Sequence, residues 1–263
     1  MVKAIFFDID GTLREFEEKG IRTDTRQALA RAREAGIRLF IATGRHFLEM
    51  ESEHLLDGLE FDAYVTLNGQ YCYEDSPGRP VIYKNPIGRS QVEIILKGLE
   101  ERPFPCLFME AERWYLNYVD EKVERIQKGI GTRIPPLGDV RQALGHEIYQ
   151  IIPYLSEDDA RELAGHLPGC DYTVWHDGEG VDLTPKGGGK CVGIREVLAF
   201  YGIDPRDTAA IGDGNNDVSM IEYAGIGIAM GNGTVKARNA ADHVTGNVAE
   251  GGLAQAIEYL LSR

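Results

Sequence analysis

Short apolar runs that alternate with helical patterns limit the folds that this chain can adopt. Near the N-terminus, the runs over residues 3–8, 37–43 and 63–67 have the composition of buried strands. The pattern returns near the C-terminus, where strands are expected over 208–211 and 226–229. Strands that alternate with helices are typical of a parallel sheet with crossover helices. The sequence therefore predicts an α/β, doubly wound, Rossmann-like core.

The expected connecting helices are marked by caps and by apolar residues at helical spacing. Thr23-Asp24 would cap a first helix that ends at Gly36, and a polar helix is expected over 46–56. Apolar residues spaced three and four apart predict further helices, which lie over residues 194–201, 217–223 and 253–260.

The middle of the chain has a different pattern, in which short alternating segments dominate. Strands are expected over 106–109, 114–118, 147–152, 172–175 and 180–183, with helices over 92–99, 121–128 and 158–166. Hairpins beside helices favour an α+β unit with an antiparallel sheet. Pro and Gly cluster near both ends of this region, at 76–80 and 185–189. We therefore predict an inserted α+β domain over 83–184, within a core domain formed by 1–82 and 185–263.

Charge and composition argue against several classes of partner. The chain has 28 Lys+Arg against 42 Asp+Glu, a formal net charge of −14, which disfavours nucleic-acid and anionic-membrane binding. It has no apolar run of about 18 residues and no signal-peptide pattern. The four cysteines lie far apart, which favours reduced, packed thiols over a zinc cluster or a disulfide framework. We expect a cytoplasmic protein without a nucleic-acid or membrane partner.

Four polar segments stand where the predicted strands end or a helix begins. They are Asp8-Ile9-Asp10-Gly11-Thr12, Thr43-Gly44-Arg45, the glycine-rich stretch up to Lys190, and Gly212-Asp213-Gly214-Asn215-Asn216-Asp217. In open α/β sheets, ligands bind at the carboxyl ends of the strands. Three of these segments would converge if their strands are adjacent and parallel, and Lys190 would enter from the start of a helix.

Asp8 and Asp10 would crowd two negative charges at one strand end. A divalent cation would relieve that crowding, and hard carboxylate oxygens suit Mg²⁺. Asp213 and Asp217 would add acid at the same edge, and the absence of His favours an oxygen-ligand metal over zinc. A lone Asp-x-Asp-Gly is equally an ordinary turn. An EF-hand is excluded because the glycine comes fourth rather than sixth in the loop.

Thr43-Gly44 and Lys190 are candidates for holding a phosphate group. The threonine offers a hydroxyl and the loop offers backbone N–H groups, although Thr-Gly is also common in turns. Lys190 would stand at a helix start, where the macrodipole makes a cation slightly unfavourable. A neighbouring anion would explain that position, and a solvated lysine is the alternative.

In their order along the chain, these segments resemble the motifs of the haloacid dehalogenase superfamily of phosphotransferases. The resemblance rests on Asp8-x-Asp10-Gly11-Thr12-Leu13, Thr43-Gly44-Arg45, Lys190 and Gly212-Asp213-x-x-Asn216-Asp217. Ala229-Met230-Gly231-Asn232-Gly233, with Val235-Lys236 and Ala240-Ala241-Asp242 after it, is similar to the Cof-type branch with a type IIB cap. The insertion between Thr43 and Lys190 also matches the position of that cap. The chain departs from the pattern at Gly188-Gly189, at Cys191 and at Arg14.

The resemblance implies a role for each motif residue. Asp8 would be the nucleophile that forms an aspartyl-phosphate, and Asp10 would protonate the leaving oxygen and then activate water. Mg²⁺ would bind Asp8, the Asp10 carbonyl and Asp213. The phosphoryl oxygens would be held by Thr43, the Gly44 backbone and Lys190, with Asn216 as a further phosphate-binding residue. Asn216 and Asp217 would order metal-bound water or Lys190.

The implied function is that of a Mg²⁺-dependent phosphatase for a small phosphorylated metabolite, with a sugar phosphate as one candidate. A phosphomutase of the phosphomannomutase type is the nearest alternative. A non-catalytic phospho-acceptor module also clusters Asp, Thr and Lys at strand ends, but it needs no large inserted domain and carries its acceptor on a later strand.

Several further residues are candidates without an assigned role. In the inserted domain they are the polar or aromatic residues near strand ends, namely Glu110, Arg113, Trp114, His176 and Asp182. The alternative is that these side chains face solvent or pack locally. Asn68-Gly69 would line the cleft or form an ordinary turn. Arg45 is expected to pair with an acid rather than to touch phosphate.

Overall fold

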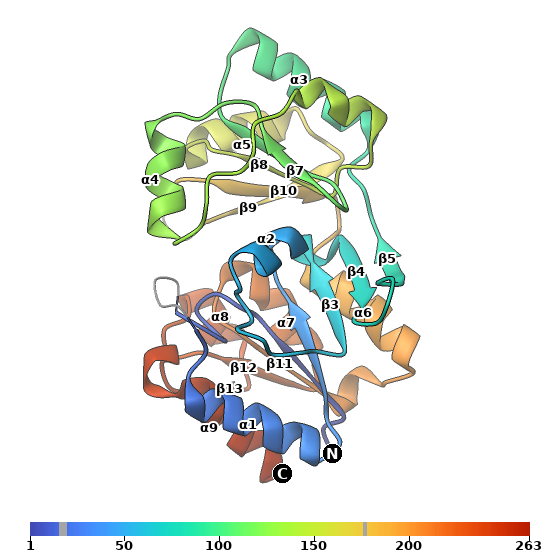
Figure 1. Cartoon of the computed structure of the whole chain (residues 1–263), viewed down its shortest axis with the longest axis vertical. Coiled ribbons are helices and arrows are strands. Elements are labelled where there is room, and N and C mark those ends of the chain that lie inside the picture. Colours follow the sequence, from blue (N-terminus) through green and yellow to red (C-terminus); the bar gives the residue numbers. More distant parts are fainter. Residues whose placement is uncertain (16–19, 176–177) are drawn as a thin grey trace. The chain divides into compact units, whose positions relative to one another are not determined.

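The computed structural model describes residues 1–15, 20–175 and 178–263. The described chain divides into two compact units (Figure 1). The core unit comprises Met1–Tyr83 and Gly189–Arg263, and the inserted unit comprises Lys84–Gly188. None of the helices in the described part combines the length and the apolar character that crossing a bilayer requires.

The core unit is built on a sheet that has eight strands within the described residues. In spatial order they are β13 (His243–Val244), β12 (Ile226–Ala229), β11 (Thr208–Gly212), β1 (Ala4–Phe7), β2 (Arg38–Ala42), β3 (Ala63–Thr66), β4 (Tyr71–Glu74) and β5 (Val81–Lys84). The strands from β13 to β3 run parallel to one another, whereas β4 runs antiparallel to β3. The predicted α/β core is confirmed, with an antiparallel addition at one side.

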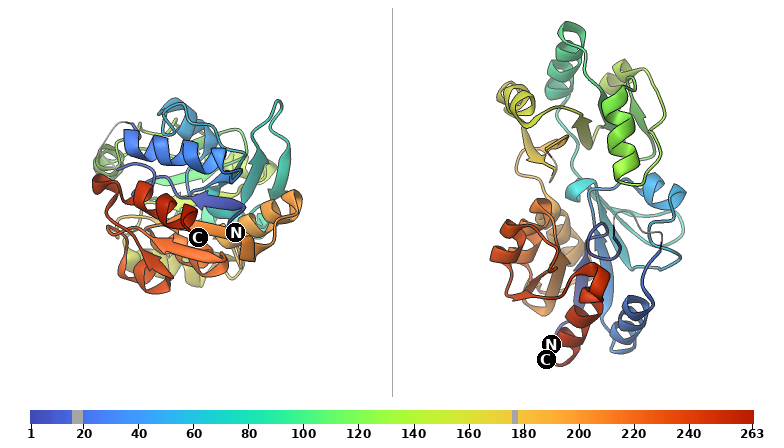
Figure 2. Two further views of the ribbon diagram at one scale, coloured as in Figure 1. Left: turned by 90° about the horizontal axis from the view of Figure 1, so that it is seen from below. Right: turned by 90° about the vertical axis from the view of Figure 1, so that its left-hand side faces the viewer.

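Helices cover both faces of this sheet, which explains why its strands are continuously apolar. Successive side chains of β1 point to opposite faces: Ile5 and Phe7 belong to one apolar cluster, and Phe6 belongs to the other. The first cluster includes α1 (Thr23–Glu34) and α9 (Gly252–Leu261), and the second includes α6 (Lys190–Tyr201), α7 (Val218–Tyr223) and α8 (Val235–Ala240). The two chain ends lie close together in the core unit (Figure 2).

The structure corrects several of the predicted elements in the core unit. The helix α2 (Phe47–Ser52) is shorter than the expected 46–56, because the chain turns at His54, whose φ is 51°. Thr23 is the first residue of α1 and Arg22 takes the N-cap position, so the predicted Thr23-Asp24 cap is wrong. The strands β4, β5 and β13 and the helix α8 were not predicted. They are short, and segments of two to six residues carry too little periodicity to be recognised.

The inserted unit has an antiparallel sheet, as the sequence predicts. Its spatial order is β7 (Trp114–Leu116), β6 (Cys106–Met109), β8 (Gln150–Pro153), β10 (Val181–Pro185) and β9 (Cys170–Val174). The helices are α3 (Arg89–Glu101), α4 (Glu121–Gly129) and α5 (Glu157–Gly165). Apolar residues of α3 and α5 pack on Phe108, Ile151 and Leu183 of this sheet. The role of this unit as a cap, and the limits 83–184 drawn from the sequence, stay predictions.

Candidate active site

Three of the four motif segments lie at one edge of the core sheet. The strands β11, β1 and β2 are neighbours and parallel, and Phe7 at the end of β1 pairs with Ile211 on one side and Ile41 on the other. The carboxyl ends of these strands therefore meet, and Asp8 follows directly. The condition that the sequence left open, adjacency of the three strands, is met.

Lys190 joins this edge as the first residue of α6, as predicted, and its side chain is fully buried. Its ammonium group donates a hydrogen bond to Asp8 Oδ1 at 2.6 Å and another to Asp217 Oδ1. A buried ammonium at a helix N-terminus is unfavourable by itself, so the two carboxylates are what hold it there. Burial lowers the pKa of Lys190, but the charges of Asp217 and Asp8 raise this pKa by more than burial lowers it. The side chain therefore stays positively charged.

Asp217 ties the last motif segment together. Its Oδ2 accepts hydrogen bonds from the backbone N–H groups of Asp213 at 2.9 Å and Gly214 at 2.8 Å, while its Oδ1 accepts from Lys190. Both carboxylate oxygens are thus engaged by N–H donors. This arrangement agrees with a residue that orients Lys190 and the loop around Asp213.

Two of the acidic groups at this edge, Asp8 and Asp213, have raised pKa values. Burial raises the pKa of Asp8 to about 7, the charge of Asp217 adds to the effect, and Lys190 opposes it. Burial, followed by the charges of Asp8 and Asp217, raises the pKa of Asp213 well above its ordinary value, although Thr12 donates a hydrogen bond to Asp213 Oδ1 at 3.1 Å. The site therefore has more carboxylates than its own cations can neutralise.

This donor set fits a hard divalent cation. One oxygen from each of Asp8, Asp213 and Asp217 lies within 4.8 Å of the others. Within the described residues, Asp10 Oδ1 is buried and has no hydrogen-bond partner. Oxygen ligands of this kind are those that Mg²⁺ prefers, and a double positive charge would offset the excess negative charge.

Gly11 leaves the space that this cluster needs. Its φ is +79°, and a Cβ atom at this position would lie 2.4 Å from Asp213 Oδ2. A side chain would therefore strain the backbone and push the carboxylate out of place.

Gly11→Ala is expected to lower kcat/KM by roughly 10- to 100-fold, because it displaces a predicted metal ligand. Gly36→Ala is the matched control, since Gly36 has a φ of +80° but no atom within 4 Å of the Cβ position. Gly36→Ala should lose about 1 kcal/mol of unfolding free energy in urea, and Gly11→Ala at least as much; only Gly11→Ala should lose activity. Equal activity of the two variants would contradict this role of Gly11.

Arg45 pairs with two acids, which confirms the expected pairing; that it does not touch phosphate stays a prediction. Its Nε donates to Asp10 Oδ2 at 2.7 Å, and the guanidinium also forms an ion pair with Glu49 of α2. Burial lowers the pKa of Arg45, but the charges of Asp10 and Glu49 raise this pKa by more than burial lowers it. Arg45 therefore remains a fixed cation that orients one oxygen of Asp10.

Thr43 and Asn216 lie at the same edge as Asp8. Thr43 is 1% exposed, and its Oγ1 accepts a hydrogen bond from the Arg45 N–H at 3.1 Å. Asn216 Nδ2 donates to Asn68 Oδ1 at 2.9 Å, so the turn after β3 also reaches the site. The sequence left the role of Asn68 open.

Asn232 is a contact residue that the sequence reasoning missed. Its Nδ2 donates to the Gly11 carbonyl at 2.8 Å, and its Oδ1 accepts from the Val248 N–H at 2.8 Å. It thereby braces the loop after β1 from the C-terminal part of the chain. The signal was present in the Gly231-Asn232-Gly233 motif, which had carried only the family resemblance.

The candidates in the inserted unit have local partners. Arg113 Nε donates to Glu110 Oε2 at 2.7 Å, and Asp182 Oδ1 accepts from Gln150 at 3.2 Å and Trp175 at 3.0 Å. Trp114 is half-buried in β7, and His176 lies outside the described residues. A role for these residues toward a substrate stays a prediction.

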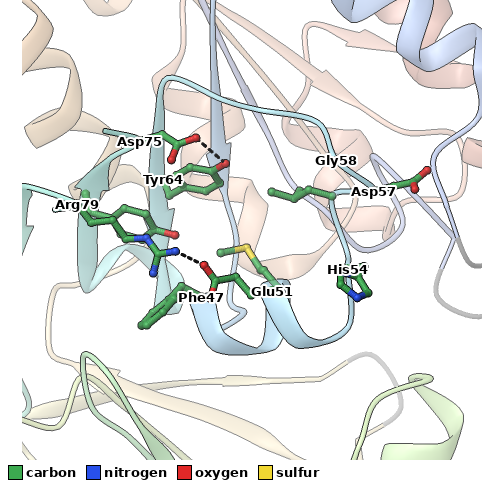
Figure 3. Close-up of a pocket in the computed structure, with 11 residues that line it drawn as sticks. Phe47, Glu51, His54, Asp57, Gly58, Tyr64, Asp75 and Arg79 are labelled. Carbon is green, nitrogen blue, oxygen red and sulfur yellow. Dashed lines mark hydrogen bonds and ion pairs between the residues drawn. The ribbon is translucent and has the colours of Figure 1, made fainter. Parts of the chain in front are cut away.

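A separate pocket of about 280 Å³ lies beside α2, between this helix and the β3–β4 pair (Figure 3). Its charged groups already have partners: Arg79 forms an ion pair with Glu51, and the Tyr64 hydroxyl donates to Asp75 at 3.4 Å. Among the described residues that line it, none is a predicted site residue. We therefore place the candidate site at the carboxylate cluster and not in this pocket.

Comparison with known proteins gives consistent matches along the whole chain. The family model for haloacid dehalogenase-like hydrolases matches residues 5–257. The putative phosphatase YkrA of Bacillus subtilis (strain 168) is 34% identical over 261 residues, which cover 98% of this chain and 97% of that protein. Pyridoxal phosphate phosphatase YbhA of Escherichia coli (strain K12) is 28% identical, with 97% of each chain covered.

Solved structures of similar proteins have the same fold. The subclass IIB sugar phosphatase BT4131 is 33% identical and superimposes with a TM-score of 0.86, over 98% of this chain and 99% of that chain. The phosphatase BT1666 from Bacteroides thetaiotaomicron is 29% identical, with a TM-score of 0.89 over 100% of this chain and 96% of that chain.

Proposed function

Because this chain belongs to the haloacid dehalogenase-like hydrolases and acts on phosphate monoesters, we propose that it is a Mg²⁺-dependent phosphatase of the Cof type. Its substrate would be a small phosphorylated metabolite, and the reaction would pass through an aspartyl-phosphate on Asp8. The observation that carries the proposal is the contact of Asp8 with the buried Lys190, beside Asp213 and Asp217.

In the first step, an Asp8 carboxylate oxygen attacks phosphorus and forms the new P–O bond. The bond from phosphorus to the ester oxygen breaks, and Asp10 supplies the proton that the leaving alcohol takes up. Lys190 holds Asp8 Oδ1, which fixes the carboxylate and leaves its other oxygen for attack. Asp8 must be ionised for this step, although burial favours its protonated form.

In the second step, water attacks phosphorus and the bond between phosphorus and Asp8 breaks. Asp10 accepts the proton from water, so that both aspartates return to their starting state. Arg45 supports this double role, because it holds Asp10 Oδ2 at 2.7 Å and leaves Oδ1 for proton transfer.

The phosphoryl oxygens would be held by the Thr43 hydroxyl, the Gly44 N–H, Lys190 and Asn216. These donors stand where negative charge develops in the transition state, which is where they accelerate the reaction. Asp8, the Asp10 carbonyl and Asp213 would hold Mg²⁺. Asn216 and Asp217 would order metal-bound water or Lys190. When bound, the metal would screen the negative charges of the carboxylates and the phosphate from one another.

Mg²⁺ affinity should fall as the pH falls through about 7. The pKa of Asp8 is raised to about 7 and that of Asp213 is raised as well, so protons compete with the metal below this pH. Titration calorimetry between about pH 8 and pH 5.5 should show a loss of up to about tenfold in affinity per pH unit for each competing proton. A constant affinity over this range would contradict the predicted ligands.

The substrate class is supported by the similar proteins, which include a sugar phosphatase and a pyridoxal phosphate phosphatase. A sugar phosphate is our leading candidate. The proposal also includes a cytoplasmic location. It includes no nucleic-acid or membrane partner, and the net charge of −14 supports this part of the proposal.

Phosphate release from a panel of phosphorylated metabolites, with and without Mg²⁺, tests the proposal. We expect Mg²⁺-dependent release of inorganic phosphate from at least one small phosphate ester. Isomerisation without release would favour a phosphomutase, and a long-lived aspartyl-phosphate with negligible turnover would favour a phospho-acceptor module. No release under any metal condition would argue against a phosphatase.

A further inference from the structure

We propose that Asn68 is a positioning residue, which fixes the phosphate-binding segment Thr43–Arg45 and the side chain of Asn216 in position relative to each other. This inference rests on the proposed function. It starts from the turn Leu67–Gly69, which follows β3 and contacts the other motif segments.

The backbone of this turn has an unusual conformation. Leu67 has a φ of 51° and Asn68 a φ of 53°, so two successive residues other than glycine adopt left-handed conformations. Asparagine tolerates this region, whereas leucine does so at a cost. Both residues are buried. Strain of this kind persists where the surrounding contacts hold it in place, and it concentrates at functional sites.

The turn is bonded to the segment that carries Thr43. The Asn68 N–H donates to the Thr43 carbonyl at 3.0 Å, and the Leu67 N–H donates to the Arg45 carbonyl at 3.4 Å. The Asn68 amide also lies against Gly44, where a Cβ atom would be 3.1 Å from Asn68 Nδ2. The position of Asn68 thus sets the position of the loop that offers a hydroxyl and N–H groups to phosphate.

The same turn contacts the other two motif segments. Asn68 Oδ1 accepts from Asn216 Nδ2, and a Cβ atom on Gly69 would lie 2.3 Å from the Gly189 carbonyl oxygen, directly before Lys190. Gln70 Nε2 donates to the Asn68 carbonyl at 2.9 Å, and this buried hydrogen bond stabilises the turn. One short turn therefore packs on all three segments that would surround the phosphoryl group on this side of Asp8.

The bond between the two amides explains why an asparagine is useful here. By accepting one N–H of Asn216, Asn68 fixes the rotation of the Asn216 amide, and so the direction of its oxygen and its second N–H. An amide that rotated freely would have to be oriented again in each reaction, and this ordering would add to the activation free energy. The effect of Asn68 should therefore pass through Asn216 and through Thr43–Arg45.

The test uses Asn68→Gly, Asn216→Ala and the double variant. Glycine adopts a φ of +53° freely, so Asn68→Gly should keep a melting temperature close to that of the wild type. We expect kcat to fall roughly 10- to 100-fold with a much smaller change in KM. The inhibition constant for vanadate, which mimics the transition state, should rise in proportion to the loss in kcat/KM. The double variant should lose less than the product of the two single losses.

Thr208→Val is the structural control. Thr208 is buried at the opposite end of β11, and its hydroxyl donates to the Pro205 carbonyl at 2.6 Å. This variant should lower the melting temperature and leave kcat and vanadate inhibition unchanged.

Two results would overturn the inference while the proposed function stands. One is an Asn68→Gly enzyme with wild-type kcat and vanadate inhibition, and the other is a double variant whose loss equals the product of the single losses. If the wild-type protein releases no phosphate from any ester, the proposed function itself fails.

Discussion

Asp8→Asn is expected to abolish turnover and to leave the protein folded. The amide has nearly the same shape as the carboxylate and can still accept the hydrogen bond from Lys190, but it cannot attack phosphorus. Loss of the nucleophile should lower kcat on the order of 10⁴-fold or more. Phosphate release, followed continuously on the best substrate of the panel, measures the effect.

The stability of Asp8→Asn should equal or exceed that of the wild type when Mg²⁺ is absent. Burial raises the pKa of Asp8 to about 7, so above this pH the folded protein is destabilised by keeping Asp8 charged. The amide removes that cost. Asp75→Asn changes an exposed acid elsewhere in the core unit and should keep full activity. Normal activity of Asp8→Asn would refute the assigned nucleophile.

Lys190→Met should cause the largest loss of stability among single substitutions at the site. It removes the cation that lies between Asp8 and Asp217 and leaves two carboxylates buried together. Breaking a buried pair in this way costs about 3–5 kcal/mol. Urea unfolding at about pH 8 without Mg²⁺ should show this loss, and phosphatase activity should disappear as well.

The loss should shrink as the pH is lowered. Without Lys190, the pKa of Asp8 rises further, so the variant gains stability on protonation at a pH where the wild type still keeps its ion pairs. Lys236→Met is the control, because Lys236 is exposed and its loss should change the free energy of unfolding by less than about 0.5 kcal/mol. A Lys190→Met protein as stable as the wild type at about pH 8 would contradict the role of Lys190 as the neutralising group.

The core was largely predictable because its strands are buried on both faces. A strand such as β1 is apolar at every position, and a polar motif follows it at once, so that both the strand and its end are visible in the sequence. What the sequence could not decide was that β11, β1 and β2 are neighbours, because strand order depends on packing between distant segments. The pairing of Lys190 with Asp8, 182 positions away, follows only from that order.

The turn at Asn68 shows where local patterns fail. Asn-Gly after a strand is the ordinary signature of a turn. Nothing in this local sequence reveals that Leu67 also has a left-handed backbone, or that Asn216 donates a hydrogen bond to the Asn68 side chain. In the inserted unit, strands could be predicted from alternation, whereas the contact of Asp182 with Gln150 joins residues 32 positions apart.

The most direct test of the account is the detection of a phosphate group on Asp8 during turnover. The enzyme would be quenched in acid while it hydrolyses its best substrate with Mg²⁺, reduced with borohydride and digested for peptide mass spectrometry. Asp10→Asn, which should slow the second step, provides the sample in which the intermediate accumulates. We expect reduction to convert Asp8 alone to an alcohol, and only in samples that received both substrate and Mg²⁺. Phosphate release without any modification of Asp8, in the wild type and in Asp10→Asn, would contradict the account.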